Sequence, residues 1–502
     1  MESNAAHAQV FDVLVVGGGI NGAGIARDAV GRGLSTLLVE RDDLASATSQ
    51  WSTKLVHGGL RYLEHYEFRL VAESLAEREV LLAQAPHLIE PLSFVLPHEP
   101  HLRPAWMIRA GLFLYDRLGG KMTLPRSFGV DLRHSKWGAG LQKRLTRGFV
   151  YADARVDDAR LVVMTAMSAR DKGADIRTRT RFERAVREAG IWRATLVDTH
   201  GVRSEVRARA IVNAGGPWVA PVLDTIDAMP TTARVRHVKG SHIVVPRINA
   251  EDHAYILQNA DNRIVFAIPY QSRYTLIGTT DVPVDGYEQP QISDQETDYL
   301  LELVNRYLEK PVSRADIVWT YSGVRPLYDD GEANPAAVTR DYVLKLDAGA
   351  DGKAPPVLSI YGGKLTTYRK LAEAAMRELH PFFPAMRGEW TAREPIAGGD
   401  VPGRDRAAFT ADVVRRHASL PPALLTDLVK RHGALVDRVL GDAQRLADLG
   451  RTFTDHLTER EVEYLRSNEW ARTADDVLWR RTKCGIGASP EQRDSLARFL
   501  GG

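Results

Sequence analysis

The segment FDVLVVGGGINGAGIARDAVGRGLSTLLVE, residues 11–40, determines the expected fold. An apolar run over 11–16 leads into a glycine-rich turn, and small residues with helical spacing follow over 23–30. A glycine-containing break separates them from a second apolar run, 34–39, which closes on Glu40. This order predicts a strand, a helix and a second strand, that is, a βαβ unit.

The turn carries the spacing Gly17-x-Gly19-x-x-Gly22. In a dinucleotide site, the first glycine allows the tight turn, the second lets the backbone approach the pyrophosphate, and the third lets helix pack on strand. A bare match also occurs in ordinary turns, but here it follows a strand and opens a helix. Glu40 is placed to accept the ribose hydroxyls, which disfavours NADP. NAD and FAD share the half that this motif binds, so both remain open.

Two later segments bear on the choice between the two cofactors. AIVNAGGPW, residues 210–218, is a strand that ends in small residues and permits close backbone approach to a ligand. GGKLTT, residues 362–367, is a second glycine-rich helix start, whose free amides could hold the carbonyl edge of an isoalloxazine ring. The plainer interpretations are an ordinary strand-to-turn transition and a capped helix.

The rest of the chain predicts two further parts. Apolar runs over 243–245, 264–268 and 274–277 are rich in β-branched and aromatic residues with no helix between them, which indicates an antiparallel sheet. The last hundred or so residues have apolar pairs at helical spacing and predict a helical domain.

Composition excludes several classes of protein. Sixty-six Lys and Arg residues nearly balance 64 Asp and Glu residues, so no overall charge recruits nucleic acid. The only cysteine, Cys484, excludes internal disulfides, cysteine-rich zinc sites and iron–sulfur clusters. We expect no metal, so redox chemistry would need an organic cofactor. The N-terminus lacks the pattern of a signal peptide, and no apolar run reaches about 18 residues, so we expect a cytoplasmic location.

A set of motifs makes the chain resemble a known family. It resembles the glycine/D-amino-acid oxidase class of flavoproteins and, within that class, the aerobic glycerol-3-phosphate dehydrogenases. The motifs are residues 17–24, 52–64 (STKLVHGGLRYLE), 239–242 (KGSH), 278–281 (GTTD), 322–326 (SGVRP), 362–368 (GGKLTTY) and, near the end, 479–483 (WRRTK).

The resemblance implies a function. It implies a non-covalent FAD, oxidation of sn-glycerol 3-phosphate to dihydroxyacetone phosphate, and transfer of the electrons to a membrane quinone. It also implies a peripheral protein of the cytoplasmic membrane face, partly cytoplasmic, and we expect a homodimer. The fold class expected is α/β with α+β: a Rossmann-like FAD-binding domain (10–90, 150–230 and 345–385), an insertion with a possible membrane-docking segment (91–149), an antiparallel-sheet substrate domain (231–344) and a helical C-terminal domain (386–502).

Cofactor contacts are carried over from the family position by position. They are Gly17, Gly18, Gly19, Asn21, Gly22, Glu40, Arg41, Thr48, Ser49, Lys54, His57, Gly58, Gly59, Ala214, Gly215, Trp218, Gly363, Lys364, Leu365 and Thr366.

Substrate contacts follow from the chemistry. A phosphate dianion calls for Arg and Lys side chains. The matching motifs offer Arg61, Tyr62, Arg325 and Lys364, with Arg340 as an extra candidate.

The catalytic group we expect comprises His57, Arg325 and Lys364. His57 is the preferred base because the ordinary pKa of histidine is near neutral. Arg325 and Lys364 could serve as the base instead, although arginine is nearly impossible to deprotonate and is a better stabiliser of a developing alkoxide. His242 is a weaker candidate.

Three alternatives stay open at this point. A glycerol-phosphate oxidase would use oxygen as acceptor. An amino-acid or amine oxidase of the same fold would need one cationic residue instead of a cluster. A flavin- or nucleotide-sensing module would not reduce its flavin with glycerol 3-phosphate.

A candidate membrane-docking segment lies at 102–118. Apolar and aromatic residues interleave there with arginines, as on helices at a lipid interface. A core helix with arginines extended to the surface is the alternative. The residues are Trp106, Met107, Ile108, Leu112, Phe113, Leu114 and Tyr115, with Arg103, Arg109 and Arg117.

Overall fold

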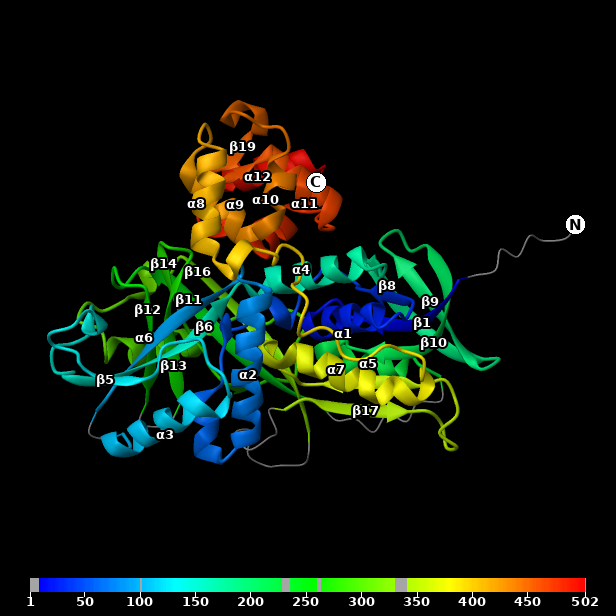
Figure 1. The fold of residues 1–502 in the computed structure, drawn as a ribbon, viewed down its shortest axis with the longest axis horizontal. Helices are drawn as coiled ribbons and strands as arrows, with labels where there is room; N and C mark the ends of the chain where they lie inside the picture. Colours follow the sequence, from blue (N-terminus) through cyan, green and yellow to red (C-terminus); the bar gives the residue numbers. More distant parts are fainter. Residues whose placement is uncertain (1–8, 100–101, 228–234, 260–262, 330–340, 502) are drawn as a thin grey trace, which may run out of the picture.

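The computed structural model describes residues 9–99, 102–227, 235–259, 263–329 and 341–501. Two sheets with their helices form the body of the molecule, and the C-terminal helices form a separate layer against helix α4, Asp158–Asp171 (Figure 1). A bilayer-spanning helix is absent from the described part of the chain, where every helix is too short or too polar to cross.

The first sheet has a parallel centre in the order β18-β10-β1-β2-β7. Strand β17 pairs antiparallel with β18 at one edge, and β8 and β9 form an antiparallel extension of β10. The strands are β1 Val10–Val16, β2 Thr36–Val39, β7 Asp175–Arg177, β8 Thr180–Glu188, β9 Ile191–Asp198, β10 Arg203–Asn213, β17 Val343–Asp347 and β18 Val357–Tyr361.

Alternating residues of β1 face opposite sides of this sheet, as the period of a strand requires. Val13 and Val15 join a core with helices α1 (Ile20–Gly31), α4 and α7 (Tyr368–Leu379), whereas Leu14 and Val16 join a core beneath β8 and β9. The predicted βαβ unit is confirmed as β1, α1 and β2. The helix begins at Ile20, three residues before the predicted stretch, because Gly19 is extended and serves as its N-cap.

The second sheet is largely antiparallel, in the order β15-β11-β14-β13-β12-β4-β6-β3, with β16 on β11 and β5 on β6. The strands are β3 Leu55–Val56, β4 Ile89–Pro97, β5 Phe128–Asp131, β6 Arg147–Val156, β11 Val235–Pro246, β12 His253–Gln258, β13 Ile264–Tyr270, β14 Tyr274–Gly278, β15 Val282–Pro283 and β16 Trp319–Tyr328. The apolar runs predicted as strands lie in β11, β13 and β14, which confirms the antiparallel sheet.

Helices cover both faces of the second sheet. Helices α2 (Phe68–Gln84) and α3 (Ala105–Leu118) contribute Leu75 and Leu112 to one core, and α6 (Asp294–Asn305) packs on the other face. Short helices complete the body: α5 Val219–Asp224 and the 3₁₀ turns Thr48–Gln50, Leu60–His65, Lys136–Gly138, Gly216–Trp218, Arg314–Asp316, Leu365–Thr367 and His380–Phe382.

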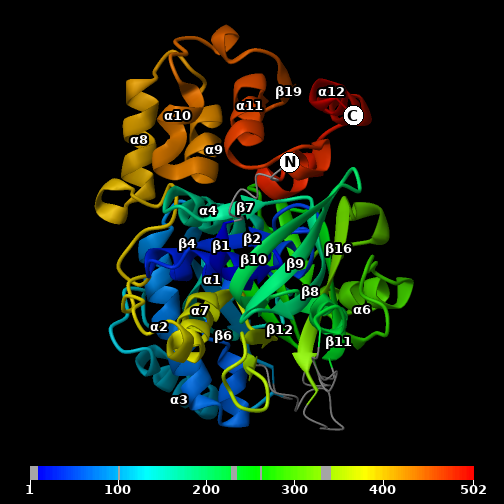
Figure 2. The same ribbon diagram turned by 90° about the vertical axis from the view of Figure 1, so that its right-hand side faces the viewer.

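The C-terminal layer has its own apolar core, in which Leu425 and Leu465 are fully buried. Its helices lie together above α4 in both views (Figure 2). They are α8 Arg406–Arg416, α9 Pro422–His432, α10 Val436–Leu440, α11 Glu459–Asn468, α12 Pro490–Leu500, a π-helix Asp476–Arg481, and the 3₁₀ turns Pro402–Arg404, Gly433–Leu435, Leu446–Leu449 and Cys484–Ile486. A hairpin of β19 (Thr452–Thr454) and β20 (Leu457–Thr458) completes it, so the predicted helical domain also contains two short strands.

The predicted fold class is confirmed, and the exact division into domains stays a prediction. Two strands do not follow the predicted division. Strand β3 and most of β6 fall in ranges predicted for the FAD-binding domain, yet both pair within the second sheet. The chain passes between the sheets at these points, a connection that periodicity along the sequence does not reveal.

Candidate active site

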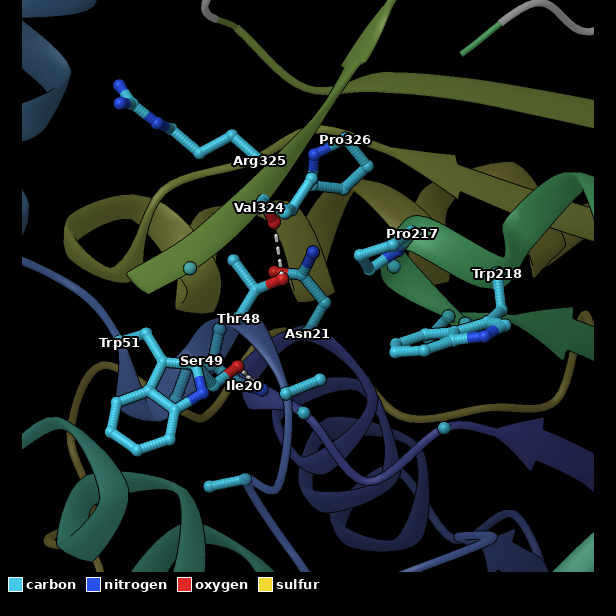
Figure 3. Close-up of a pocket in the computed structure, with 18 of the residues that line it drawn as sticks. Ile20, Asn21, Thr48, Ser49, Trp51, Pro217, Trp218, Val324, Arg325 and Pro326 are labelled. Carbon is cyan, nitrogen blue, oxygen red and sulfur yellow. Dashed lines mark hydrogen bonds between the residues drawn. The ribbon is translucent and has the colours of Figure 1, made fainter. Parts of the chain in front are cut away.

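One cavity of about 560 Å³ lies where the carboxyl ends of β1, β2, β10 and β18 meet the second sheet. That volume is within the usual range for small-molecule and cofactor sites. The carboxyl edge of a parallel sheet is also where ligands bind in open α/β folds. Figure 3 shows Trp51 and Trp218 on two sides of this cavity, with Asn21 and Thr48 between them.

The glycines of the first turn are required by close backbone contacts. Gly17 has a φ of +112°, and a Cβ there would lie 2.5 Å from the carbonyl oxygen of Ala214. A Cβ on Gly22 would lie 1.9 Å from the carbonyl oxygen of Gly17. Side chains at either position would therefore displace the turn that brings the first amides of α1 to the cavity.

Glu40 closes β2 and lines the cavity, as predicted. Its carboxylate accepts hydrogen bonds from the amide of Gly18 at 2.6 Å and from the amide of Asp42 at 2.8 Å. Burial raises the pKa of this carboxyl, and the two amide hydrogen bonds oppose the shift. Two amides thus hold the carboxylate at the position where a ribose hydroxyl donates to it in dinucleotide sites.

An aromatic platform stands beside Glu40. The Arg41 guanidinium carbon lies 4.7 Å from the centre of the Trp218 ring, and Tyr287 meets that ring edge-on at 5.3 Å. The Trp218 Nε1 atom is buried and has no hydrogen-bond partner in the structure. A flat ring with an unsatisfied donor, next to a ribose-binding carboxylate, fits the adenosine half of a dinucleotide.

The two glycine-rich helix starts meet at Asn21. Its side-chain nitrogen donates to the carbonyl oxygen of Gly362 at 3.1 Å, whereas its Oδ1 atom is buried without a partner. Nearby, Ser49 accepts from the amide of Ile20 at 3.0 Å (Figure 3). Thr48 donates to the carbonyl oxygen of Val324 at 2.6 Å. The predicted cofactor residues Gly17, Gly19, Asn21, Thr48, Ser49 and 363–366 therefore surround one cavity, and the polar groups present fit FAD.

The predicted catalytic residues also meet in this cavity, which His57, Arg325, Lys364 and Tyr62 all line. The Nζ atom of Lys364 lies 3.9 Å from the centre of the Tyr62 ring. The His57 amide donates to Thr366 Oγ1 at 3.2 Å, so the histidine backbone is tied to the second helix start.

Burial lowers the pKa of His57, and the positive charge of Lys364 adds to the effect, while Asp153 opposes it. The imidazole is consequently neutral at neutral pH and able to accept a proton.

His242 is a second histidine on the cavity wall. Its ring stacks on Tyr321 with centres 4.6 Å apart, and its Nε2 atom is 3.1 Å from Thr53 Oγ1. Burial lowers its pKa well below the usual value, and Lys54 and Arg325 contribute. Its Nδ1 atom is buried and has no hydrogen-bond partner in the structure.

Several predicted contacts do not line the cavity. The Lys54 ammonium is buried against Asp158 at 2.8 Å, so it serves an ion pair behind the wall. A Cβ on Gly58 would lie 2.5 Å from Leu75, and Gly59 has a φ of +73°, so packing and a turn account for these two glycines. Arg61 likewise stands outside the lining.

Gly18 and Gly22 shape the turn without lining the cavity. Arg340 lies outside the described residues.

Other lining residues were not predicted. Thr180, Phe182, Thr225, Trp51 and Thr53 line the cavity, and Thr53 contacts His242. Residues 180 and 182 belong to β8, whose sequence carries no glycine motif. Only the antiparallel extension of the first sheet brings that strand to the site.

Comparison with known proteins identifies the family. The family model described as FAD dependent oxidoreductase matches residues 12–369. The chain belongs to this family. A second model, described as the C-terminal domain of alpha-glycerophosphate oxidase, matches residues 390–500, which hold the C-terminal helices. The predicted cofactor, FAD, is confirmed.

Individual relatives of the family span nearly the whole chain. The glycerol-3-phosphate dehydrogenase of Pseudomonas aeruginosa is 52% identical over 98% of this chain and 95% of its own length. The D-erythritol 1-phosphate dehydrogenase of Brucella abortus is 48% identical over 99% and 98%. The X-ray structure of the glycerol-3-phosphate dehydrogenase from Bacillus halodurans complexed with FAD has a TM-score of 0.73 and 25% identity, covering 98% and 94%. The resemblance drawn from the motifs is confirmed.

Proposed function

We propose that this protein oxidises sn-glycerol 3-phosphate to dihydroxyacetone phosphate and passes the electrons to a membrane quinone. The observation that carries the proposal is the convergence of Arg325, Lys364, Tyr62 and His57 on the FAD cavity. Full-length relatives that are named for this substrate support it. When bound, FAD supplies the two-electron acceptor for the hydride of a secondary alcohol.

The cationic groups bind and orient the substrate. Arg325 and Lys364 supply the charge that a phosphate dianion requires, and the Tyr62 ring positions the Lys364 ammonium. Arginine keeps its proton at any physiological pH, so Arg325 stabilises charge and does not act as the base. The neutral His57 imidazole takes the hydroxyl proton as the alkoxide develops.

A second substrate is favoured by one comparison. The Brucella abortus relative is named for D-erythritol 1-phosphate, which has one more carbinol than glycerol 3-phosphate. Both substrates place a phosphate and a secondary alcohol on one short chain, so the cationic cluster serves either. The discriminating contact must touch the added carbinol.

Helix α3 is the proposed membrane contact. Trp106 is 70% exposed and Phe113 is 52% exposed, and both share the helix with Arg109 and Arg117. Exposed aromatic rings between arginines suit the headgroup region of an anionic bilayer.

Not all of the predicted segment belongs to that surface. Leu112 and Tyr115 are buried, so α3 has a core face and an outer face. The proposed location remains the cytoplasmic face of the cell membrane, and the homodimer remains a prediction.

The test is the flavin spectrum under anaerobic conditions. Glycerol 3-phosphate, D-erythritol 1-phosphate and glycerol are each added to the purified protein, and flavin absorbance is followed in a single turnover. Rapid bleaching by glycerol 3-phosphate alone supports the proposal. Faster bleaching by D-erythritol 1-phosphate would make that compound the substrate. Equal bleaching by glycerol would mean that no phosphate site exists.

The acceptor is tested separately, by reoxidising the reduced protein with a soluble quinone analogue or with oxygen. Faster reoxidation by oxygen would make the protein an oxidase. Reduction by an amino acid or amine, and not by either phosphate ester, would indicate the amine-oxidising alternative.

A further inference from the structure

The loop after β2, residues 41–47, has two faces. Asp42, Ala45 and Ser46 line the cofactor cavity. Ala45 also donates its amide to the carbonyl oxygen of Gly18 at 3.0 Å, which fixes the loop to the glycine turn. The side chain of Asp43 points the other way and is 1% exposed. A buried carboxylate on the back of a cofactor loop needs a partner, because an unpaired buried charge is costly.

The hydrogen bonds to the Asp43 carboxylate come from the C-terminal layer, and Arg179, just before β8, lies 3.9 Å from its Oδ1 atom. Arg481 donates to both carboxylate oxygens, at 2.8 Å and 2.9 Å, and its side chain is fully buried. Arg480 adds a third hydrogen bond at 2.6 Å. Bidentate guanidinium–carboxylate pairs fix geometry as well as charge. The end of the π-helix Asp476–Arg481 is therefore fastened to the back of the cofactor loop.

The same segment makes a second attachment a few residues further on. The Nζ atom of Lys483 is 3.8 Å from Asp157 and 4.0 Å from Asp158. Asp158 in turn accepts from Ser52 at 2.7 Å and from Lys54 at 2.8 Å, on the chain that leads to His57.

Aromatic packing continues this contact to the second sheet. Trp479 stacks on Trp319 of β16, with ring centres 4.9 Å apart and planes 16° apart. Residues 479–483 thus contact Asp43 directly, reach Ser52 and Lys54 through Asp158, and contact the strand that carries Arg325.

We propose that residues 479–483 are a clamp by which the C-terminal domain holds FAD in its site, with Asp43 and Arg481 as positioning residues. The proposal builds on FAD binding and assigns the C-terminal domain a role in cofactor retention. A loop ordered in advance loses less conformational freedom when a ligand binds, so fastening Asp43 strengthens FAD binding without any contact between Arg481 and FAD. Releasing the loop loosens Ser46, Ala45 and Asp42 together.

The experiment measures the FAD dissociation constant of the full-length protein by the recovery of flavin fluorescence on dilution. Arg481→Met and Asp43→Asn should each raise it about tenfold, because either change removes the bidentate pair that fixes the loop. Arg480 still bonds Asp43 in the first variant, and the Glu469 carbonyl oxygen still accepts from Arg481 in the second. The FAD dissociation constant of the double variant should be close to that of either single variant and below the value expected if the two effects added, because the two residues act through one contact. Arg481→Lys should recover part of the affinity.

The matched control lies in the same domain. Glu461 is fully buried and pairs with Arg431 at 2.7 Å and with His432 at 2.9 Å, whereas Arg481 pairs with Asp43. Glu461→Gln should lower the unfolding temperature and leave the FAD dissociation constant within about twofold of wild type. If Glu461→Gln and Arg481→Met weaken FAD binding equally at equal loss of unfolding temperature, the clamp is refuted and the domain only adds stability.

A milder variant tests the clamp if Arg481→Met does not fold. Arg480→Gln removes the hydrogen bond to Asp43 together with the ion pair to Asp476, and it should weaken FAD binding in the same direction. If the Arg480→Gln and Asp43→Asn variants both fold and both bind FAD as tightly as the wild type, the clamp is refuted. The assay uses no substrate, so failure of glycerol 3-phosphate to reduce the flavin would refute the proposed function and leave this result untouched.

Discussion

The Nη2 atom of Arg325 lies 2.7 Å from the Oδ1 atom of Asp281, and it donates a hydrogen bond to the carbonyl oxygen of Thr280 at 3.1 Å. Both side chains are about one-third exposed, so solvent screens the pair. A Cβ on Gly240 would lie 2.7 Å from the same nitrogen, so glycine makes room for the guanidinium. Asp281 therefore orients Arg325 at the cavity wall, and an incoming phosphate must compete with it.

Removing the Arg325 guanidinium should lower kcat/KM. A hydrogen bond to a charged group contributes roughly 1.5–3 kcal/mol, which corresponds to about 10- to 150-fold for Arg325→Met. If Arg325 binds phosphate equally in the ground and transition states, KM rises and kcat holds. If it stabilises the alkoxide, kcat falls. Steady-state kinetics with saturating FAD distinguish these two outcomes. Arg325→Lys shows whether a positive charge without the bidentate guanidinium geometry is enough for activity.

Removing the Asp281 charge should have the opposite effect on anion binding. Asp281→Asn relieves the competition, so inorganic phosphate should inhibit glycerol 3-phosphate oxidation more strongly. Exposed ion pairs contribute about 0.2–1 kcal/mol, so we expect the inhibition constant to fall by at most about fivefold. A rise in that constant would instead mean that Asp281 holds Arg325 in its phosphate-binding position.

A single methyl group should eliminate cofactor binding at Gly22. Gly22→Ala places a Cβ 1.9 Å from the Gly17 carbonyl oxygen, so the turn must open and the flavin absorbance of the purified protein should be lost. The control is Gly111→Ala on α3, where no atom lies within 4 Å of the added Cβ. That variant should keep its flavin and gain about 0.5–1 kcal/mol from better helix propensity. Retained flavin in Gly22→Ala would show that the turn adapts.

The membrane surface on α3 is tested by an exposed pair and a buried neighbour. Trp106→Ser combined with Phe113→Ser should reduce flotation with anionic vesicles while the flavin content stays intact, because both side chains face outward. Leu112→Ser is the comparison, since Leu112 is fully buried on the same helix and its truncation should cost about 2–5 kcal/mol of stability. Unchanged flotation of the double variant would refute the surface.

The cofactor half of the site was predictable because its constraints are local. Gly17, Gly22 and Glu40 lie within one βαβ unit, where spacing along the chain dictates spacing in the fold. Lys54 was different. Its motif matched the family, yet a buried ion pair with Asp158, more than a hundred residues away, withdraws the ammonium from the cavity. No local pattern shows such a partner.

Long-range pairing also explains what the sequence could not locate. Phe182 reaches the cavity because β8 extends the first sheet through β9. Asp43 stands in none of the motifs, and its contact with Arg481 from the far end of the chain exists only in the folded protein. Contacts that close such distances depend on the completed fold.

The pH dependence of flavin reduction tests His57 as the base. Burial lowers the pKa of His57 below its ordinary value near 6.5, so the imidazole stays neutral above that pH and becomes protonated only as the pH falls through the lowered pKa. A protonated imidazole cannot accept the hydroxyl proton. The rate of reduction by glycerol 3-phosphate should therefore be level at neutral and alkaline pH and should fall on the acid side.

His57→Ala should remove this acid-side decline and lower the level rate by about 10²- to 10⁴-fold, the usual contribution of a general base. Anaerobic stopped-flow measurement of flavin absorbance across pH gives both quantities. His242→Asn is the comparison, because burial lowers the pKa of His242 as well and its ring also lines the cavity. If the decline persists in His57→Ala and vanishes in His242→Asn, the proton goes to His242, and His57 only shapes the wall beside Lys364.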